Sequence, residues 1–237
     1  MSVTRTLGAR CLAEGLGAGL LVATVVGSGI AAQQLSPGEV GLQLLESSTA
    51  TVLALAALIL TFGPVSGAHL NPAVTLAEAV TGKLAGRAVP AYIGAQVAGG
   101  CLGAVVANLM FELPAVDVST HDRLTAATFL AEVVATFGLL TVIFGVVRSG
   151  RMTAVPIAVA GYIGAAYWFT SSTSFANPAV TVARSLTDTF TGIAPGSVPP
   201  FLLAQVLGAL AAVGFSRFVF PDVPAADLVV PHDAESN

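Results

Sequence analysis

The chain has 237 residues, of which 55% are hydrophobic and 9% are charged, and its mean hydropathy is +0.86. Because a water-soluble domain carries about 25% charged residues, this composition excludes a soluble protein and predicts an integral membrane protein. The length accommodates about six membrane-spanning helices of roughly 20 residues each. The net charge of −4 excludes nothing further, because the charges lie at segment ends.

Six apolar runs are expected to cross the membrane, at about 11–32, 49–63, 88–111, 124–147, 154–170 and 200–220. The first run is long and contains Glu14 and a Gly-x-x-x-Gly spacing, which favours a packed membrane helix over a cleaved signal peptide. Polar residues predict a loop at 33–48 and an aqueous loop at 112–123. The cysteines, Cys11 and Cys101, lie within apolar runs and are expected to pack there as small residues.

The second half of the chain repeats the order of the first. Each half begins with a run that contains a glutamate, Glu14 or Glu132, and ends with a run that contains a glutamine, Gln96 or Gln205. Each half has three runs, and because three is an odd number, the second half enters the membrane from the opposite side. The repeat is therefore predicted to be inverted.

The distribution of lysine and arginine predicts the orientation. If both termini face the cytoplasm, Arg123 and Arg184 face outward and the seven other lysines and arginines face inward. We therefore expect a multi-pass protein of the cell membrane with both termini in the cytoplasm. The predicted boundaries are 1–221 for one membrane domain, about 1–111 and 124–221 for its two repeats, and 222–237 for an acidic, disordered cytoplasmic tail.

A pentapeptide that opens a helix occurs once in each half, as Asn71-Pro72-Ala73-Val74-Thr75 and as Asn177-Pro178-Ala179-Val180-Thr181. Asparagine caps helix starts and proline suits the first helical position, so each copy predicts a helix of about ten residues. Such a helix is about 15 Å long, half of the ~30 Å hydrocarbon core. Two of them that enter from opposite faces place both positive helix ends at the midplane, where they repel cations but not uncharged solutes. We expect the oxygens of Asn71 and Asn177 to cap these helices and their NH₂ groups to stay free for a passing hydroxyl.

These residues resemble the aquaporin/glycerol-facilitator family, the major intrinsic proteins. The motifs SGAHLNPAVT and FANPAV, together with the paired glutamates and glutamines, extend the resemblance over nearly the whole chain. It implies an all-α membrane fold with six transmembrane helices plus two half-helices in an inverted repeat. It also implies a homotetramer in the lipid bilayer, with one pore per subunit and small neutral solutes in transit. Glu14 and Glu132 are then expected to accept hydrogen bonds from the backbone of the two dipping loops.

The chain departs from the family at Val180, where typical members have an arginine that narrows the outer selectivity filter. Counting along the motifs also places Thr51 and Ser174 in the filter and leaves Tyr167 or Ala165 as the fourth member. Valine in place of arginine predicts a wider, less polar filter, which favours glycerol-type polyols and metalloid hydroxides such as arsenite. The sequence is similar to a bacterial branch with this second motif that is linked with arsenic resistance. A channel mainly for water and an ion-coupled secondary transporter are the alternatives.

Three polar residues near the motifs are candidates for the vestibules. Arg184 lies about one turn outside the filter and is interpreted as an interfacial residue that snorkels or pairs with Asp188, with a displaced filter charge as the alternative. Glu78 is expected to line the inner vestibule or to pair with Lys83, and His69 to touch the pore or to brace its loop. No His/Cys cluster indicates a metal, and nothing in the sequence indicates a cofactor, an enzymatic activity or a nucleic-acid partner.

Overall fold

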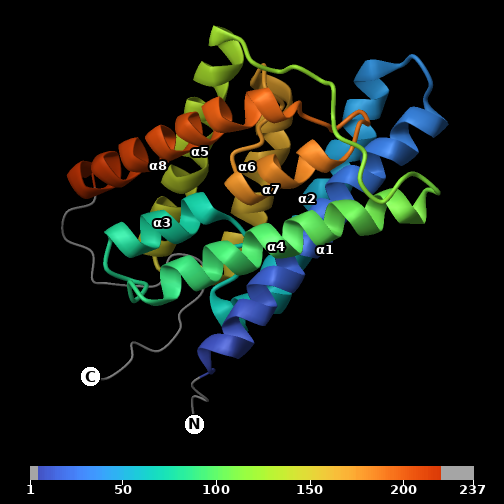
Figure 1. Cartoon of the computed structure of the whole chain (residues 1–237). Coiled ribbons are helices and arrows are strands. Elements are labelled where there is room, and N and C mark those ends of the chain that lie inside the picture. The colour runs from blue at the N-terminus through green and yellow to red at the C-terminus, as the bar shows by residue number, and fades with distance from the viewer. Residues whose placement is uncertain (1–4, 220–237) are drawn as a thin grey trace.

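The structure, a computed structural model, describes residues 5–219, and the predicted acidic tail at 222–237 lies outside the described residues. Six long helices and two short ones make up the described part of the chain (Figure 1). The long helices are α1 (Leu7–Leu35), α2 (Val40–Ser66), α4 (Ala88–Met110), α5 (Ala126–Arg148), α6 (Val155–Phe169) and α8 (Val198–Val219), and the short ones are α3 (Pro72–Val80) and α7 (Pro178–Ala183). The fold class predicted from the sequence is therefore confirmed.

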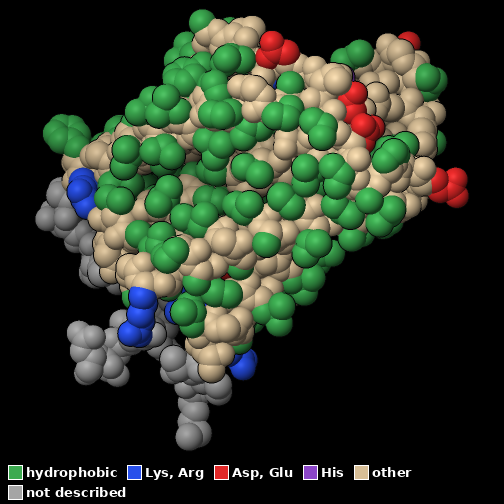
Figure 2. Space-filling model, viewed as in Figure 1, with side chains coloured by type: hydrophobic (Ala, Val, Ile, Leu, Met, Phe, Trp, Pro, Cys, Tyr) green, Lys and Arg blue, Asp and Glu red, His purple; other side chains and the backbone are tan. Residues whose placement is uncertain are grey.

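All six long helices are long and apolar enough to cross a membrane, counting the single 3₁₀ turns that precede α6 and α8. Figure 2 shows apolar side chains over the whole width of this face of the bundle. On the same face, lysines and arginines lie near the end that carries the termini, and aspartates and glutamates lie near the opposite end. Because no soluble protein exposes such a surface, the chain is an integral, multi-pass membrane protein.

The helix pair α1 and α4 is packed through glycines. A Cβ atom added to Gly99 would collide with the backbone carbonyl of Gly15, and one added to Gly103 would collide with that of Gly19. The backbones of the two helices are thus in direct contact, which is how membrane helices associate closely without a hydrophobic driving force between them. Because Glu14 lies on α1, this close contact fixes its position.

Helix α2 begins at Val40, inside the segment that the sequence predicted to be a polar loop. The first turns of this helix carry Gln43 and Ser47, whose side chains are buried against the end of α1. Gln43 Nε2 donates to the carbonyl of Ser36 at 2.8 Å, and the hydroxyls of Ser47 and Ser28 lie 3.2 Å apart. The hydropathy pattern did not predict these turns as part of a helix, because their side chains are polar. These polar groups form hydrogen bonds within the protein.

The loop between α4 and α5, predicted as an aqueous loop at 112–123, is partly buried. The backbone N–H groups of Asp117 and Ser119 donate to the carbonyls of Leu186 and Ser185, each at 3.0 Å. Ser119 is buried as a result. This segment covers the chain that follows α7, and it thereby supports the end of the site, described next, that lies away from the termini.

Candidate functional site

The two short helices begin at the asparagines of the repeated pentapeptide. Asn71 Oδ1 accepts from Ala73 N at 2.8 Å, and Asn177 Oδ1 accepts from Ala179 N at 3.0 Å, so both side chains cap their own helix. Pro72 and Pro178 hold the first helical position of each. The helices are shorter than the predicted ten residues, with nine in α3 and six in α7, and a 3₁₀ turn continues α7. Both are therefore too short to span the membrane.

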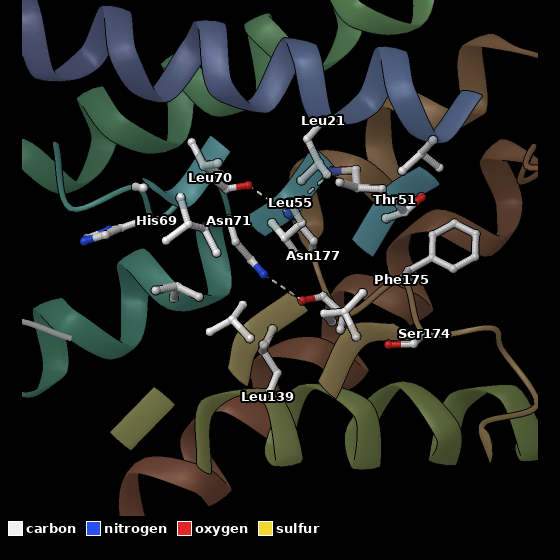
Figure 3. A pocket seen from close by; sticks show the side chains of 18 of the residues that line it. Leu21, Thr51, Leu55, His69, Leu70, Asn71, Leu139, Ser174, Phe175 and Asn177 are labelled. Carbon is white, nitrogen blue, oxygen red and sulfur yellow. Dashed lines mark hydrogen bonds between the residues drawn. The ribbon is translucent and has the colours of Figure 1, made fainter. Parts of the chain in front are cut away.

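The two loops that precede these helices are bonded to each other through the asparagine amides. Asn71 Nδ2 donates to the carbonyl of Ala176, and Asn177 Nδ2 donates to the carbonyl of Leu70, each at 2.8 Å (Figure 3). The prediction that both NH₂ groups stay free is therefore wrong, because one N–H of each serves this reciprocal link. An amide NH₂ has two hydrogens, so one donor on each asparagine is left for a solute.

A buried glutamate holds the first loop in place. Glu14, fully buried, accepts from the backbone N–H groups of His69 and Leu70 at 2.9 and 2.7 Å, and from Gln96 Nε2 at 2.7 Å. Leu70 has a φ of +50°, a left-handed conformation that is unfavourable for leucine. The carboxylate stabilises that conformation by satisfying the N–H groups that the bend turns away from any helix.

The second loop is held in the same way. Glu132 accepts from the N–H groups of Phe175 and Ala176, both at 2.9 Å, and from Gln205 Nε2 at 2.6 Å. Ala176, like its counterpart before the first asparagine, is left-handed, with a φ of +46°. In each repeat the structure thus brings the glutamate, the glutamine and the loop together, as the inverted repeat requires. Both glutamates have a structural role.

A narrow cavity runs past the meeting point of the two helices. Its volume, counted as the space open to the centres of water molecules, is about 60 Å³. Because one water requires about 10–15 Å³ on this measure, the cavity has room for a short file of waters. His69 lies at one end, the two asparagines in the middle, and Thr51, Ser174 and Phe175 at the other end (Figure 3). Its walls are otherwise mainly apolar and include Leu21, Val25, Leu55, Ile59, Val74, Leu139, Ile143, Val159 and Ile163.

Four of the predicted filter residues line this cavity. They are Thr51, Tyr167, Ser174 and Val180, and all four are buried. Tyr167 OH donates to Thr51 Oγ1 at 3.2 Å, which ties α6 to α2. The fifth candidate, Ala165, is exposed on the outside of α6, so its placement in the filter is wrong. Helix α6 is continuous from Val155 onward, which is why counting along the helix from its start gives the residue that lines the cavity.

Arg184 also lines the cavity, and only 3% of its surface is exposed. Its Nε donates to the carbonyl of Thr191, and its guanidinium carbon lies 3.5 Å from the centroid of the Phe175 ring. The predicted pairing with Asp188 is wrong, because Asp188 accepts instead from the N–H of Thr120 at 2.8 Å. The α-helix ends at Ala183, so a rule for residues four apart on one helix face does not apply beyond it.

His69 and Glu78 form a buried pair at the other end of the cavity. His69 Nε2 lies 3.0 Å from Glu78 Oε2, and Nδ1 of the same ring lies 3.0 Å from Thr75 Oγ1. His69 both lines the cavity and braces its loop, so both expected roles fit its position. Glu78 is fully buried behind His69 and is not part of the cavity wall.

No group of three or more His, Cys, Asp or Glu side chains is arranged to hold a metal ion among residues 5–219. Two half-helices that meet beside a narrow cavity inside a membrane-spanning bundle define the protein as a membrane channel. The chain belongs to the major intrinsic protein family, whose family model matches residues 2–171.

Individual relatives agree with this assignment. The chain is 51% identical to aquaglyceroporin AqpS of Rhizobium meliloti (strain 1021) over 210 residues, which is 89% of each chain. It is 31% identical to nodulin-26 of Glycine max over 193 residues, 74% of this chain and 66% of that protein. The X-ray structure of the aquaglyceroporin from Plasmodium falciparum has a TM-score of 0.64 to this one at 21% identity, and the match covers 91% of this chain and 98% of that one. At that identity the structural match supports the fold alone.

Proposed function

We propose that the protein is a passive channel for small uncharged solutes, which conducts water, glycerol-type polyols and metalloid hydroxides such as arsenite and excludes ions and protons. The observation that carries this proposal is Val180, an apolar residue in the cavity wall directly after the second Asn-Pro-Ala. A valine leaves room and removes the five N–H donors of an arginine at this point. The name aquaglyceroporin of the relative that is 51% identical supports solutes larger than water.

The lining of the cavity supports passive transfer of a neutral molecule. Hydroxyl and amide groups face the cavity beside an otherwise apolar wall, so a solute exchanges hydration for a few hydrogen bonds without being held tightly. The positive ends of α3 and α7 face each other at the centre and raise the free energy of a cation or a relayed proton there. Both membrane-embedded glutamates near the cavity centre bond to the loops, which argues against an ion-coupled transporter.

The proposal extends to the whole protein as it sits in the cell. Residues 1–221 form one channel domain in the cell membrane, with both termini in the cytoplasm. The bias of lysine and arginine toward the end of the bundle that carries the termini supports this orientation. Four copies assemble as a homotetramer with a pore in each subunit. The protein has no enzymatic activity and uses no cofactor.

The decisive experiment is stopped-flow light scattering on proteoliposomes that contain the wild type or Val180→Arg, with water, glycerol, urea and arsenite as solutes. The wild type is expected to pass glycerol and arsenite with non-saturating kinetics that do not respond to ion gradients. Val180→Arg should lower the glycerol and arsenite fluxes more than the water flux. Equal solute selectivity in the two proteins would refute the wide filter, a wild type that passes water alone would show a water channel, and saturable ion-coupled uptake would show a transporter.

A further inference from the structure

The outer end of the cavity contains a guanidinium whose position is fixed by an aromatic ring. Arg184 lies on the face of Phe175, and Phe175 in turn packs edge-on against Phe201, with ring centroids 5.3 Å apart and planes at 78°. Both Arg184 and Phe175 line the cavity, and the backbone N–H of Phe175 is bonded to Glu132. The ring is therefore held by its own loop, and it holds the arginine against the pore.

The carboxylate of Glu132 acts on Arg184 but does not form an ion pair with it, because its oxygens accept from the N–H groups of Phe175 and Ala176 and from Gln205. Among residues 5–219 Arg184 forms no ion pair, and the acidic residue four positions on, Asp188, is bonded to Thr120. The other cation near this ring is Arg123, whose guanidinium carbon lies 5.5 Å from the centroid of Phe175. Two arginines thus lie near one phenyl ring and one carboxylate, that of Glu132, acts on both, so the sum of these charges at this end of the cavity is positive.

The same end of the cavity has polar groups without protein partners. Ser174 Oγ is buried, lines the cavity and has no hydrogen-bond partner in the described part of the chain. Of the guanidinium nitrogens of Arg184, only Nε has a hydrogen-bond acceptor within residues 5–219. A buried hydroxyl without a partner is unfavourable unless a passing molecule supplies the bond. A solute oxygen beside Ser174 and Arg184 does so.

We propose that Arg184, seven residues after Asn177, excludes cations from the outer pore and donates hydrogen bonds to the solute there. Val180 cannot do either, because its side chain has no charge and no donor. The arginine lies on Phe175 beside the cavity and leaves the width at Val180 open, so a polyol or metalloid hydroxide passes while a cation meets a fixed positive charge. The ligand class of this subsite is an uncharged molecule with two or more hydroxyl groups. The proposal rests on the proposed function for its solutes, but its charge-selecting part does not depend on which solute passes.

The test compares Arg184→Gln, Arg184→Met, Arg184→Lys and the wild type in proteoliposomes, with Arg151→Gln as the matched control because Arg151 is exposed. Four fluxes are measured for each: water, glycerol, and the leaks of protons and of methylammonium under a clamped membrane potential. Arg184→Met retains an unbranched side chain that packs on Phe175, so it serves if the glutamine variant fails to fold. Folding is checked by size-exclusion chromatography and by retained water flux.

The neutral variants should conduct water while their proton and methylammonium leak rises at least about tenfold, a change of about 1.4 kcal/mol in the barrier. Arg184→Lys should still exclude cations, but its glycerol-to-water ratio should fall, because an ammonium lacks the planar fork of an arginine. Cation exclusion equal to that of the wild type in a folded neutral variant overturns the proposal, as does a cation leak in folded Arg184→Lys. Failure of the proposed function is a separate result, since it appears as absent glycerol flux in the wild type itself.

Discussion

His69 Nε2 lies 3.0 Å from Glu78 Oε2, and the equivalent positions of the second repeat, Phe175 and Arg184, are also in contact, with the guanidinium carbon 3.5 Å from the ring centroid. In each repeat, the residue two before the motif asparagine meets the residue seven after it. The inverted repeat has thus kept one geometry and changed its chemistry. A carboxylate supports the end near the termini, and a guanidinium supports the opposite end, so the two mouths of the pore differ in charge.

The pair at the first end leads to a prediction about stability. Glu78→Ala leaves the buried His69 Nε2 without its carboxylate, and an unsatisfied buried polar group costs about 1–3 kcal/mol. We expect a lower midpoint of thermal unfolding in detergent for this variant. Glu39→Ala is the control, because Glu39 is exposed and makes no capping bond to α2. Equal midpoints for the two variants would show that the pair does not stabilise the loop.

The contact of α1 with α4 gives a prediction in which two glycines of one helix behave oppositely. Gly99→Ala drives a Cβ into the carbonyl of Gly15 and should destabilise the protein by about 1–3 kcal/mol through overpacking. Gly94→Ala meets no atom within 4 Å and should stabilise it by up to about 1 kcal/mol through helix propensity. Unfolding midpoints in detergent measure both. A stabilising Gly99→Ala would show that the two backbones are not in contact.

Much of the site was predictable because its signals are local or unavoidable. An asparagine followed by a proline caps a helix wherever it occurs, so the starts of both half-helices could be read directly. A carboxylate within the membrane requires partners, so Glu14 and Glu132 had to bond to something nearby. The structure shows those partners to be the backbone N–H groups of the two loops.

Other features depended on distances that no local pattern encodes. The reciprocal amide bonds of Asn71 and Asn177 join loops that are more than a hundred residues apart in sequence. The position of Arg184 depended on where α7 stops, and a helix of six residues gives little periodicity from which to read its end. The early start of α2 was hidden by polar side chains whose partners lie on α1 and at the residue that caps its end. In each case, tertiary contact decided the outcome.

The contact between the α4–α5 loop and the chain after α7 gives a prediction of pH dependence. The hydrogen bond from Thr120 N lowers the pKa of the partly exposed Asp188 carboxyl below its usual value of 3.8, because the bond favours the charged form. A lowered folded-state pKa means that this contribution to stability is fully present above pH 3.8 and is lost as the pH falls through the folded pKa. We expect the protection of the Thr120 amide against hydrogen exchange to fall below pH 3.8.

Two variants separate this effect from general acid unfolding. Asp188→Asn should have low Thr120 protection at every pH, because a neutral amide is the weaker acceptor. Asp117→Asn, an exposed change in the same loop, should retain the pH response of the wild type. If protection in the wild type does not change with pH while Asp188→Asn is also unaffected, the bond does not hold the loop.

The reciprocal bonds between the two dipping loops predict coupling between their asparagines. Asn71→Ala loses a helix cap, worth about 1 kcal/mol, and leaves the buried carbonyl of Ala176 without its donor. Asn177→Ala does the same to its own cap and to the carbonyl of Leu70. Because both bonds join the same two loops, breaking the first already frees the loops that the second holds. The double variant should therefore be destabilised by less than the sum of the single variants, with an interaction of about 0.5–3 kcal/mol.

A double-mutant cycle of unfolding midpoints in detergent measures this coupling, and water flux in proteoliposomes follows it in function. Each single variant is expected to conduct less water than the wild type, because its helix start no longer lies fixed against the cavity. The control cycle pairs Asn71→Ala with Glu39→Ala, an exposed change that shares no partner with it and should add without interaction. Strict additivity of the two asparagine variants would show that each loop is held by its own glutamate alone, and that the midplane of the pore is not a single unit.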